Sequence, residues 1–367
     1  MPKNVAEAAE ERLRYIFDEF DKIIVSISGG KDSTVLAYMT LLEAHRRNRR
    51  VGLLFLDEEV VYQSTVDQVD YLMNLFPENT IRLWLQFPFR LTNATSLSES
   101  QLICWEEGKH QLWMHPKKPY AIQHKPWPDE GQTVRDKNKG FGFYDVIENS
   151  QRLRTDTAFL VGRRAVESMN RFQAVSKNPG YKNCFWSTKC GGPGCVSFYP
   201  IYDWNFHDIW KYIYDHNIRY SRIYDYQFKK GMGIRDIRVS SLIHEKSFRS
   251  LVELPEFEPK TYDRLLKRIQ GIQVGHLYGK DARMLKVRKL PKNFKSWLEY
   301  RDFLLATYPD AEKKQIFEKR FARQMENNYV ARQQCRQLIL NDYENNLPVE
   351  NAEDPRELAI EKWKRLL

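Results

Sequence analysis

The stretch that decides the fold is Lys22-Ile23-Ile24-Val25-Ser26-Ile27-Ser28-Gly29-Gly30-Lys31-Asp32-Ser33. Its first half is a short apolar run rich in β-branched residues, which is typical of a buried parallel strand. Residues 34–46 follow with apolar side chains at helical spacing. The order of strand, glycine-rich turn and helix predicts a loop that ends at a helix N-terminus.

Such a loop suits phosphate, because glycine lets the backbone turn sharply and approach an anion without a Cβ atom in the way. The free N–H groups of the first helical turn and the helix dipole then favour negative charge. Lys31 adds a positive charge, Asp32 is a candidate ligand for Mg²⁺, and Ser33 is suited to bind phosphate or to cap the helix. The spacing matches neither a Walker A loop nor a dinucleotide fingerprint, and the alternative is a tight turn without a ligand. The predicted phosphate-binding residues here are Ser26, Ser28, Gly29, Gly30, Lys31, Asp32 and Ser33.

Outward from this loop, apolar runs and helical patterns alternate along the chain. Strands are predicted at 22–27, 51–56, 81–87 and 157–161, and helices at 4–20, 34–46, 60–76 and 206–216. This alternation predicts an α/β fold with a doubly wound, mainly parallel sheet and right-handed crossovers.

The domain organisation follows from where the periodicity weakens. Residues 88–142 are rich in Trp, Pro, Lys and His and lack a clear period, so they are predicted to be an insertion or lid. Beyond about residue 240 the chain has a mainly helical pattern. We expect a nucleotide-binding domain over residues 1–240 and a helical C-terminal domain over residues 241–367.

Several segments resemble known proteins. Residues 28–33 look like the signature of the PP-loop superfamily, the adenine nucleotide α-hydrolase-like ATP pyrophosphatases. Within it, residues 55–59, 161–171 and 199–204 resemble blocks of the phosphoadenosine phosphosulfate (PAPS) reductase family, in the family's order and over about residues 20–230. The resemblance implies the PP-loop fold and an adenine nucleotide, ATP or PAPS, as ligand.

The resemblance also implies residue roles. Asp57 would lie beside the nucleoside, and Lys31, Asp32 and Arg163 would be catalytic. Arginines after the strand at 157–161 can form charge-assisted, bidentate hydrogen bonds to phosphate or sulfate, at the carboxyl edge where α/β sheets bind ligands. This predicted anion clamp consists of Gly162, Arg163, Arg164 and Arg171.

The expected chemistry departs from reduction. Sulfonucleotide reductases use a cysteine in a Glu-Cys-Gly-(Ile/Leu)-His tail, whereas residues 361–367 have no cysteine and Cys335 lies in a helical pattern. We therefore expect an ATP pyrophosphatase or adenylyl transferase that cleaves ATP between the α and β phosphates with Mg²⁺. The alternatives are a PAPS reductase, and a nucleotide-sensing regulator or phage-defence component acting on DNA.

The chain has five cysteines, an odd number that argues against a disulfide framework and favours a reducing, cytoplasmic setting. Three of them, Cys184, Cys190 and Cys195, lie in a Gly/Pro-rich turn. They are candidate ligands of Zn²⁺ or an iron–sulfur cluster, with Cys104 or His207 completing the set. The alternative is a loop of unligated thiols.

Residues 255–259 and 271–275 resemble the extra C-terminal domain of the IbrA-type branch of the family, which is associated with phages and genomic islands. This resemblance covers nearly the whole chain. That resemblance implies a ParB-like partner. The net charge of +10 and the basic residues of this region suit nucleic acid as well as a merely basic soluble protein. The basic residues are Lys280, Arg283, Lys286, Arg288, Lys289, Lys292 and Lys295.

Aromatic residues at 294, 297, 300 and 303 recur at helical spacing. Such a stripe is more typical of a helix core than of a base-stacking platform. No apolar run approaches the roughly 20 residues that a membrane-spanning helix needs, so no membrane association is expected.

Overall fold

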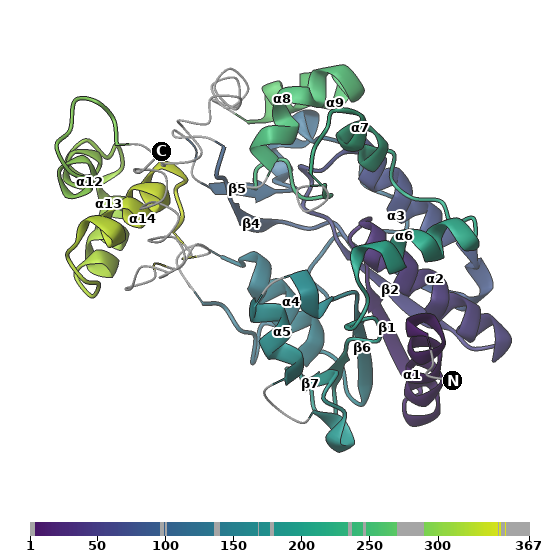
Figure 1. The fold of residues 1–367 in the computed structure, drawn as a ribbon. Helices are drawn as coiled ribbons and strands as arrows, with labels where there is room; N and C mark the ends of the chain where they lie inside the picture. Colours follow the sequence, from purple (N-terminus) through teal and green to yellow (C-terminus); the bar gives the residue numbers. More distant parts are fainter. Residues whose placement is uncertain are drawn as a thin grey trace. The chain divides into compact units, whose positions relative to one another are not determined.

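The protein is described by a computed structural model over residues 4–95, 99, 101–135, 140–167, 169–176, 180–233, 237–244, 247–269, 290–343, 345 and 349. Figure 1 shows a sheet flanked by helices, together with a group of C-terminal helices. Contacts divide the chain into two compact units. Unit 1 contains residues 1–91 and 103–241, and unit 2 contains residues 92–102 and 242–367.

The sheet of unit 1 has six strands in the order β3-β2-β1-β6-β8-β7. All neighbours pair in parallel except β7 and β8, which are antiparallel. The strands are β1 (Lys22–Ser26), β2 (Val51–Leu56), β3 (Thr80–Leu85), β6 (Thr157–Val161), β7 (Ser187–Lys189) and β8 (Val196–Phe198). The predicted α/β fold with a mainly parallel sheet is confirmed. Because β1 has β2 on one side and β6 on the other, the strand order reverses at β1, where α/β sheets place their ligands.

Helices cover both faces of this sheet (Figure 1). In β1, Ile23 and Val25 face a core shared with Leu13 of α1 and Leu36 of α2, whereas Ile24 faces the opposite side, where residues 150–154 lie. This alternation follows from the two-residue period of a strand. The helices are α1 (Val5–Glu19), α2 (Lys31–Arg46), α3 (Gln63–Leu75), α4 (Phe143–Arg152), α5 (Met169–Ser176), α6 (Phe206–Asp215) and α7 (Ile223–Lys229).

Within the region predicted as an insertion, the structure has two strands that the sequence analysis did not predict. β4 (Phe89–Thr92) and β5 (Gln101–Cys104) form a separate two-stranded sheet. Each has only four residues and two buried side chains, too few to establish a period in the sequence. Residues 92–102 belong to unit 2, where the Ala94 N–H donates to the Ile243 carbonyl at 2.9 Å.

The described residues of unit 2 beyond residue 242 are mainly helical. Its helices are α8 (Phe248–Phe257), α9 (Pro259–Arg268), α12 (Trp297–Ala306), α13 (Ala311–Phe321) and α14 (Asn328–Ile339). Phe317, Phe321, Leu338 and Tyr343 form a buried cluster. This helical C-terminal part is as expected. Across the described ranges, no helix is long and apolar enough to cross a membrane.

The aromatic stripe of α12 differs from its prediction as a helix core. Phe294 contacts Tyr300 and Phe303, with ring centroids 4.8 and 5.1 Å apart, but Phe303 is 49% exposed and α12 has no fully buried side chain. The rings therefore pack on one another and stay partly exposed to solvent. Of the predicted basic cluster, residues 280–289 lie outside the described residues, and Lys292 and Lys295 are exposed.

Candidate nucleotide-binding site

The glycine loop connects β1 to α2 at the carboxyl edge of the sheet. Gly29 has φ +70°, and a Cβ atom there would lie 2.8 Å from Thr65 Cγ2, so both conformation and space require glycine. Gly30 is the N-cap of α2, and Lys31 is its first residue. Ser26 ends β1 in register with Val161 of β6. The predicted strand–loop–helix is thus present with the loop held tightly against α3.

Two serines shape the loop. The Ser28 N–H donates to Ser33 Oγ at 3.1 Å, and the Ser33 hydroxyl contacts the Gly30 carbonyl and Ser28 Oγ, each at 3.1 Å. Thr34 N–H is bonded to the Gly30 carbonyl at 2.9 Å. The preceding N–H groups of α2 have no carbonyl one turn back to bond, which leaves the start of α2 suited to an anion.

Asp32 lies between two cations. Its Oδ2 accepts from Lys31 Nζ at 2.9 Å, and its Oδ1 lies 2.5 Å from Arg164 Nε in an ion pair that lacks directed hydrogen-bond geometry. Both carboxylate oxygens are therefore engaged, which is a poor fit to the predicted role as a Mg²⁺ ligand. The geometry instead makes Asp32 a residue that holds Lys31 and Arg164 in place.

The predicted anion clamp gathers around this carboxylate. Arg164 is 5% exposed and also pairs with Glu167 at 3.1 Å, and Arg171 forms an ion pair with Glu167. Burial lowers the pKa of Arg171, and the charges of Arg163, Arg164 and Arg238 lower it further, against the opposing effect of Asp32. Ser168 of the same block lies outside the described residues.

Arg163 and Lys31 complete the positive surroundings. The guanidinium of Arg163 lies 4.8 Å from the Tyr199 ring centroid, and its Nη1 donates to the Tyr199 hydroxyl at 3.5 Å. Burial lowers the pKa of Lys31, Asp32 opposes this, and the charges of Arg164 and Arg238 add to the lowering. Sequence reasoning missed Glu167, Tyr199, Tyr224 and Arg238 as members of this site.

Gly162 packs closely against the backbone of the first turn of α2. A Cβ atom at this position would lie 3.1 Å from both Asp32 C and Ser33 N. We expect Gly162→Ala to destabilise the fold by about 1 to 3 kcal/mol, because backbone of α2 must move. Urea unfolding would measure this, with Gly108→Ala as the control because nothing lies within 4 Å of a Cβ there. Equal stability of both variants would contradict this account of Gly162.

Asp57 lies directly after β2 in a buried polar network. Its Oδ2 accepts from Trp84 Nε1 at 2.7 Å and from Gln86 Nε2 at 2.8 Å. Its Oδ1 accepts from the Glu59 N–H at 3.0 Å and lies 3.4 Å from His115 Nε2. Asp57 is 0% exposed, so a nucleoside contact by its carboxylate would require one of these partners to leave. In this structure it shapes the loop after β2.

Residues 58–59 and 105 extend this network. Glu59 Oε2 accepts from the Trp105 N–H at 2.6 Å, and both residues have a positive φ, near 60° and 55°. Such strained backbone persists only where its surroundings fix it. Glu58 precedes Glu59 and is partly exposed as a whole residue. Burial of its carboxyl group raises the pKa to about 7. A hydrogen bond with Ser241 opposes this rise, and the charge of Asp57 adds to it.

His115 links the region predicted as an insertion to Asp57. Burial disfavours the charged ring, but Asp57 and the Pro116 carbonyl favour it, and the net effect raises the pKa of His115 above 6.5. Its contribution to stability is therefore complete below pH 6.5 and is lost as pH rises through the raised value. We expect the stability difference between wild type and His115→Gln to shrink from pH 6 to pH 9 in urea unfolding. A difference that grows over this range would contradict this assignment.

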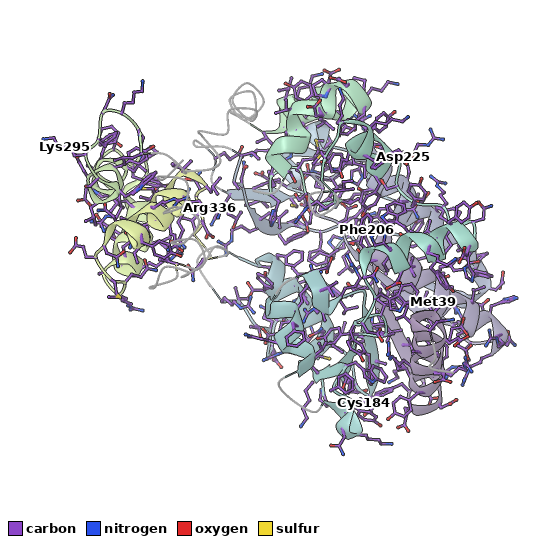
Figure 2. All side chains as sticks on the ribbon, in the orientation of Figure 1. Met39, Cys184, Phe206, Asp225, Lys295 and Arg336 are labelled. Atoms are coloured by element: carbon purple, nitrogen blue, oxygen red, sulfur yellow. The ribbon has the colours of Figure 1, made fainter. Side chains whose placement is uncertain are left out.

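The three cysteines predicted as metal ligands do not form a ligand set. Cys184 lies in the turn before β7 (Figure 2) and neighbours Tyr15, whereas Cys195 is 3% exposed with its Sγ 3.4 Å from the Arg154 carbonyl. No group of three His, Cys, Asp or Glu side chains within the described residues has metal-binding geometry. The β7–β8 hairpin places Cys184 before its first strand and Cys190 and Cys195 in its turn. A Zn²⁺ or iron–sulfur site completed by Cys104 or His207 stays a prediction.

Comparison with known proteins covers both parts of the chain. Residues 22–231 match the model of the phosphoadenosine phosphosulfate reductase domain, and residues 231–365 match that of a domain of unknown function, DUF3440. The uncharacterized protein YbdN of Escherichia coli K12 is 27% identical over 321 residues, which cover 84% of this chain and 77% of YbdN.

Two reductases are also similar. Adenosine 5′-phosphosulfate reductase of Staphylococcus saprophyticus is 23% identical over 225 residues, covering 60% of this chain and 74% of that enzyme. The crystal structure of the PAPS reductase from Candida auris, in a phosphate complex, has 18% sequence identity and a TM-score of 0.34. It covers 60% of this chain and 84% of its own.

Proposed function

Because the chain belongs to the phosphoadenosine phosphosulfate reductase domain family, we propose that it binds an adenine nucleotide and cleaves ATP between the α and β phosphates. The adenylyl group passes to an acceptor, and pyrophosphate leaves. The acceptor oxygen forms the new bond to the α phosphorus while the bond from that phosphorus to the bridging oxygen breaks.

The observation that supports this proposal is the charge around the start of α2. Five cationic side chains and only two carboxylates, those of Asp32 and Glu167, lie around the loop. Positive charge therefore exceeds negative charge there. A phosphate chain is the ligand that such a site favours, since guanidinium groups bind phosphate oxygens bidentately. The cations are Lys31, Arg163, Arg164, Arg171 and Arg238.

In the proposed reaction, negative charge develops on the departing pyrophosphate. The Lys31 ammonium group and the N–H groups of α2 that follow the Lys31 N–H stabilise that charge, and they are fixed before the reaction begins. Asp32 keeps Lys31 and Arg164 in place, and Arg163 and Arg171 bind the remaining anionic oxygens. Mg²⁺ that accompanies ATP would neutralise phosphate charge, and Asp32 would keep its contacts to Lys31 and Arg164 instead of holding the ion.

The thiols favour nucleotide cleavage over PAPS reduction. Cys104 and Cys335 are fully buried. Burial raises the pKa of Cys335 to about 12 and that of Cys190 to about 11. A thiolate nucleophile is disfavoured at both of these positions, because the thiolate is the reactive form.

The proposal is tested by incubating the protein with Mg²⁺ and ATP labelled at the α phosphorus. The expected products are pyrophosphate and either AMP or an adenylylated acceptor. Release of ADP and phosphate would contradict the proposal, and release of sulfite from PAPS with a thiol donor would favour the reductase alternative. The IbrA-type branch and a ParB-like partner stay predictions. Nucleic-acid contact stays a prediction too, and retention on DNA at varied salt would test it.

A further inference from the structure

The segment from α7 to Ser241 reaches the phosphate loop from a distant part of the sequence. The Lys31 N–H, the first of α2, donates to the Tyr224 hydroxyl at 2.9 Å. Lys31 Nζ lies 5.6 Å from the centroid of the same ring, and Tyr224 is 4% exposed. Tyr224 of α7 therefore covers one side of the start of α2.

Tyr224 keeps a proton to donate. Burial raises the pKa of its hydroxyl, although Lys31, Arg164 and Arg238 oppose the shift. Because the oxygen accepts from the Lys31 N–H, its own O–H is directed elsewhere. This part of the loop thus presents donors rather than acceptors.

Arg238 is fixed beside Tyr224 by a buried amide. Gln227 is 2% exposed; its Nε2 donates to the Arg238 carbonyl at 2.9 Å, and its Oε1 accepts from the Arg238 N–H at 2.8 Å. A side chain that bonds both backbone groups of one residue fixes that residue's position and direction. Gln227 lies one helical turn after Tyr224, so both residues extend from the same short helix.

The half-buried guanidinium of Arg238 is close to the phosphate cations. Its charge lowers the pKa of Lys31 and of Arg171. Mutual repulsion of this kind is unfavourable without a ligand and is relieved when an anion binds. Such an arrangement is expected where a ligand with several negative charges is bound.

We propose that Arg238 is a specificity-determining residue that binds the β and γ phosphates, with Gln227 as its positioning residue. This inference rests on the proposed function. In the proposed function Lys31 contacts the departing pyrophosphate. Because the charge of Arg238 acts on Lys31, we expect Arg238 to contact the same β and γ phosphates. ATP and pyrophosphate contain these two phosphates, and AMP lacks them. The site therefore distinguishes polyphosphates from nucleoside monophosphates.

The test is calorimetric titration of the full chain with ATP, pyrophosphate and AMP. We expect Arg238→Gln to weaken ATP and pyrophosphate binding about 10- to 100-fold, the loss of a charge-assisted contact, and AMP binding less than about threefold. Arg238→Lys keeps the charge and should recover part of the affinity. Gln227→Glu replaces the donor to the Arg238 carbonyl and should reproduce the same selective loss to a smaller extent. Thermal unfolding within about 2 °C of wild type checks that each variant folds.

Arg222→Gln is the matched control, because Arg222 is an exposed arginine at the N-cap of α7. An equal loss in Arg222→Gln would show a general charge effect and overturn the inference. Unchanged ATP binding by Arg238→Gln, or an equal loss for ATP and AMP, would overturn it while leaving the proposed function standing. A wild type that binds neither ATP nor pyrophosphate would overturn the proposed function itself.

Discussion

Replacing Lys31 by alanine is expected to lower kcat/KM for pyrophosphate release from ATP by about 100- to 1,000-fold, the usual cost of removing one preorganised charge-stabilising group. Lys31 is 6% exposed and is held against Asp32 at the first turn of α2. Its ammonium group contributes most where charge develops on the leaving pyrophosphate. Steady-state kinetics with a coupled pyrophosphate assay measure the change.

Lys22→Ala serves as the control for Lys31→Ala. Lys22 begins β1, is exposed and contacts Thr155 at 3.4 Å, so it shares the unit but not the site. We expect its kcat/KM to stay near that of wild type. If Lys31→Ala retained wild-type kcat/KM, the assignment of Lys31 to the leaving group would be wrong.

Asp57→Asn is expected to destabilise unit 1 by about 3 to 5 kcal/mol, as for other broken buried ionic networks. The carboxylate accepts three N–H donors at 3.0 Å or less. An amide supplies one oxygen and one NH₂ group, so at least one donor would face another donor. Because either Glu59 or the pair Trp84 and Gln86 loses its acceptor, the loop after β2 should loosen. Chemical unfolding of wild type and variant measures the effect.

The control for Asp57→Asn is Asp67→Asn. Asp67 is exposed on α3 and accepts from Gln63 at 2.9 Å, so this change should cost no more than about 0.5 kcal/mol. Similar losses in the two variants would show that the buried network does not stabilise the fold as described.

The central fold was predictable because its signals are local. The apolar run of β1, the glycines and the apolar spacing of α2 are contiguous, and so are the patterns of β2, β3 and β6. The phosphate loop and the anion clamp were predicted from contiguous residues for the same reason. In the structure, Asp32 joins them by pairing with both Lys31 and Arg164.

The remaining site residues come from long-range contacts that no local pattern encodes. Tyr224 reaches Lys31 across 193 residues of sequence, and Arg238 depends on a glutamine 11 residues away. His115 lies in a region whose apolar residues show no helical or strand spacing, and its contact with Asp57 forms only in the folded chain. The family resemblance placed Asp57 beside the nucleoside, and the donors to its carboxylate from Trp84 and Gln86 could not be predicted from the local sequence.

The prediction of a metal site at the cysteines rests on sequence spacing alone. Spacing in a Gly/Pro-rich turn is compatible with a metal site, and the structure adds that the short strands β7 and β8 make this turn a hairpin. The thiols of Cys190 and Cys195 are then in the hairpin turn, while Cys184 precedes β7. Three-residue strands are too short to be recognised from alternation.

The most direct test of the account is calorimetric titration of the wild-type protein with ATP, followed by competition with pyrophosphate. We expect saturable binding of ATP at a single site, displaced by pyrophosphate and strongly weakened in Lys31→Ala. Absence of ATP binding, or binding that neither pyrophosphate nor Lys31→Ala affects, would contradict the claim that the start of α2 and its arginines hold a nucleotide phosphate chain.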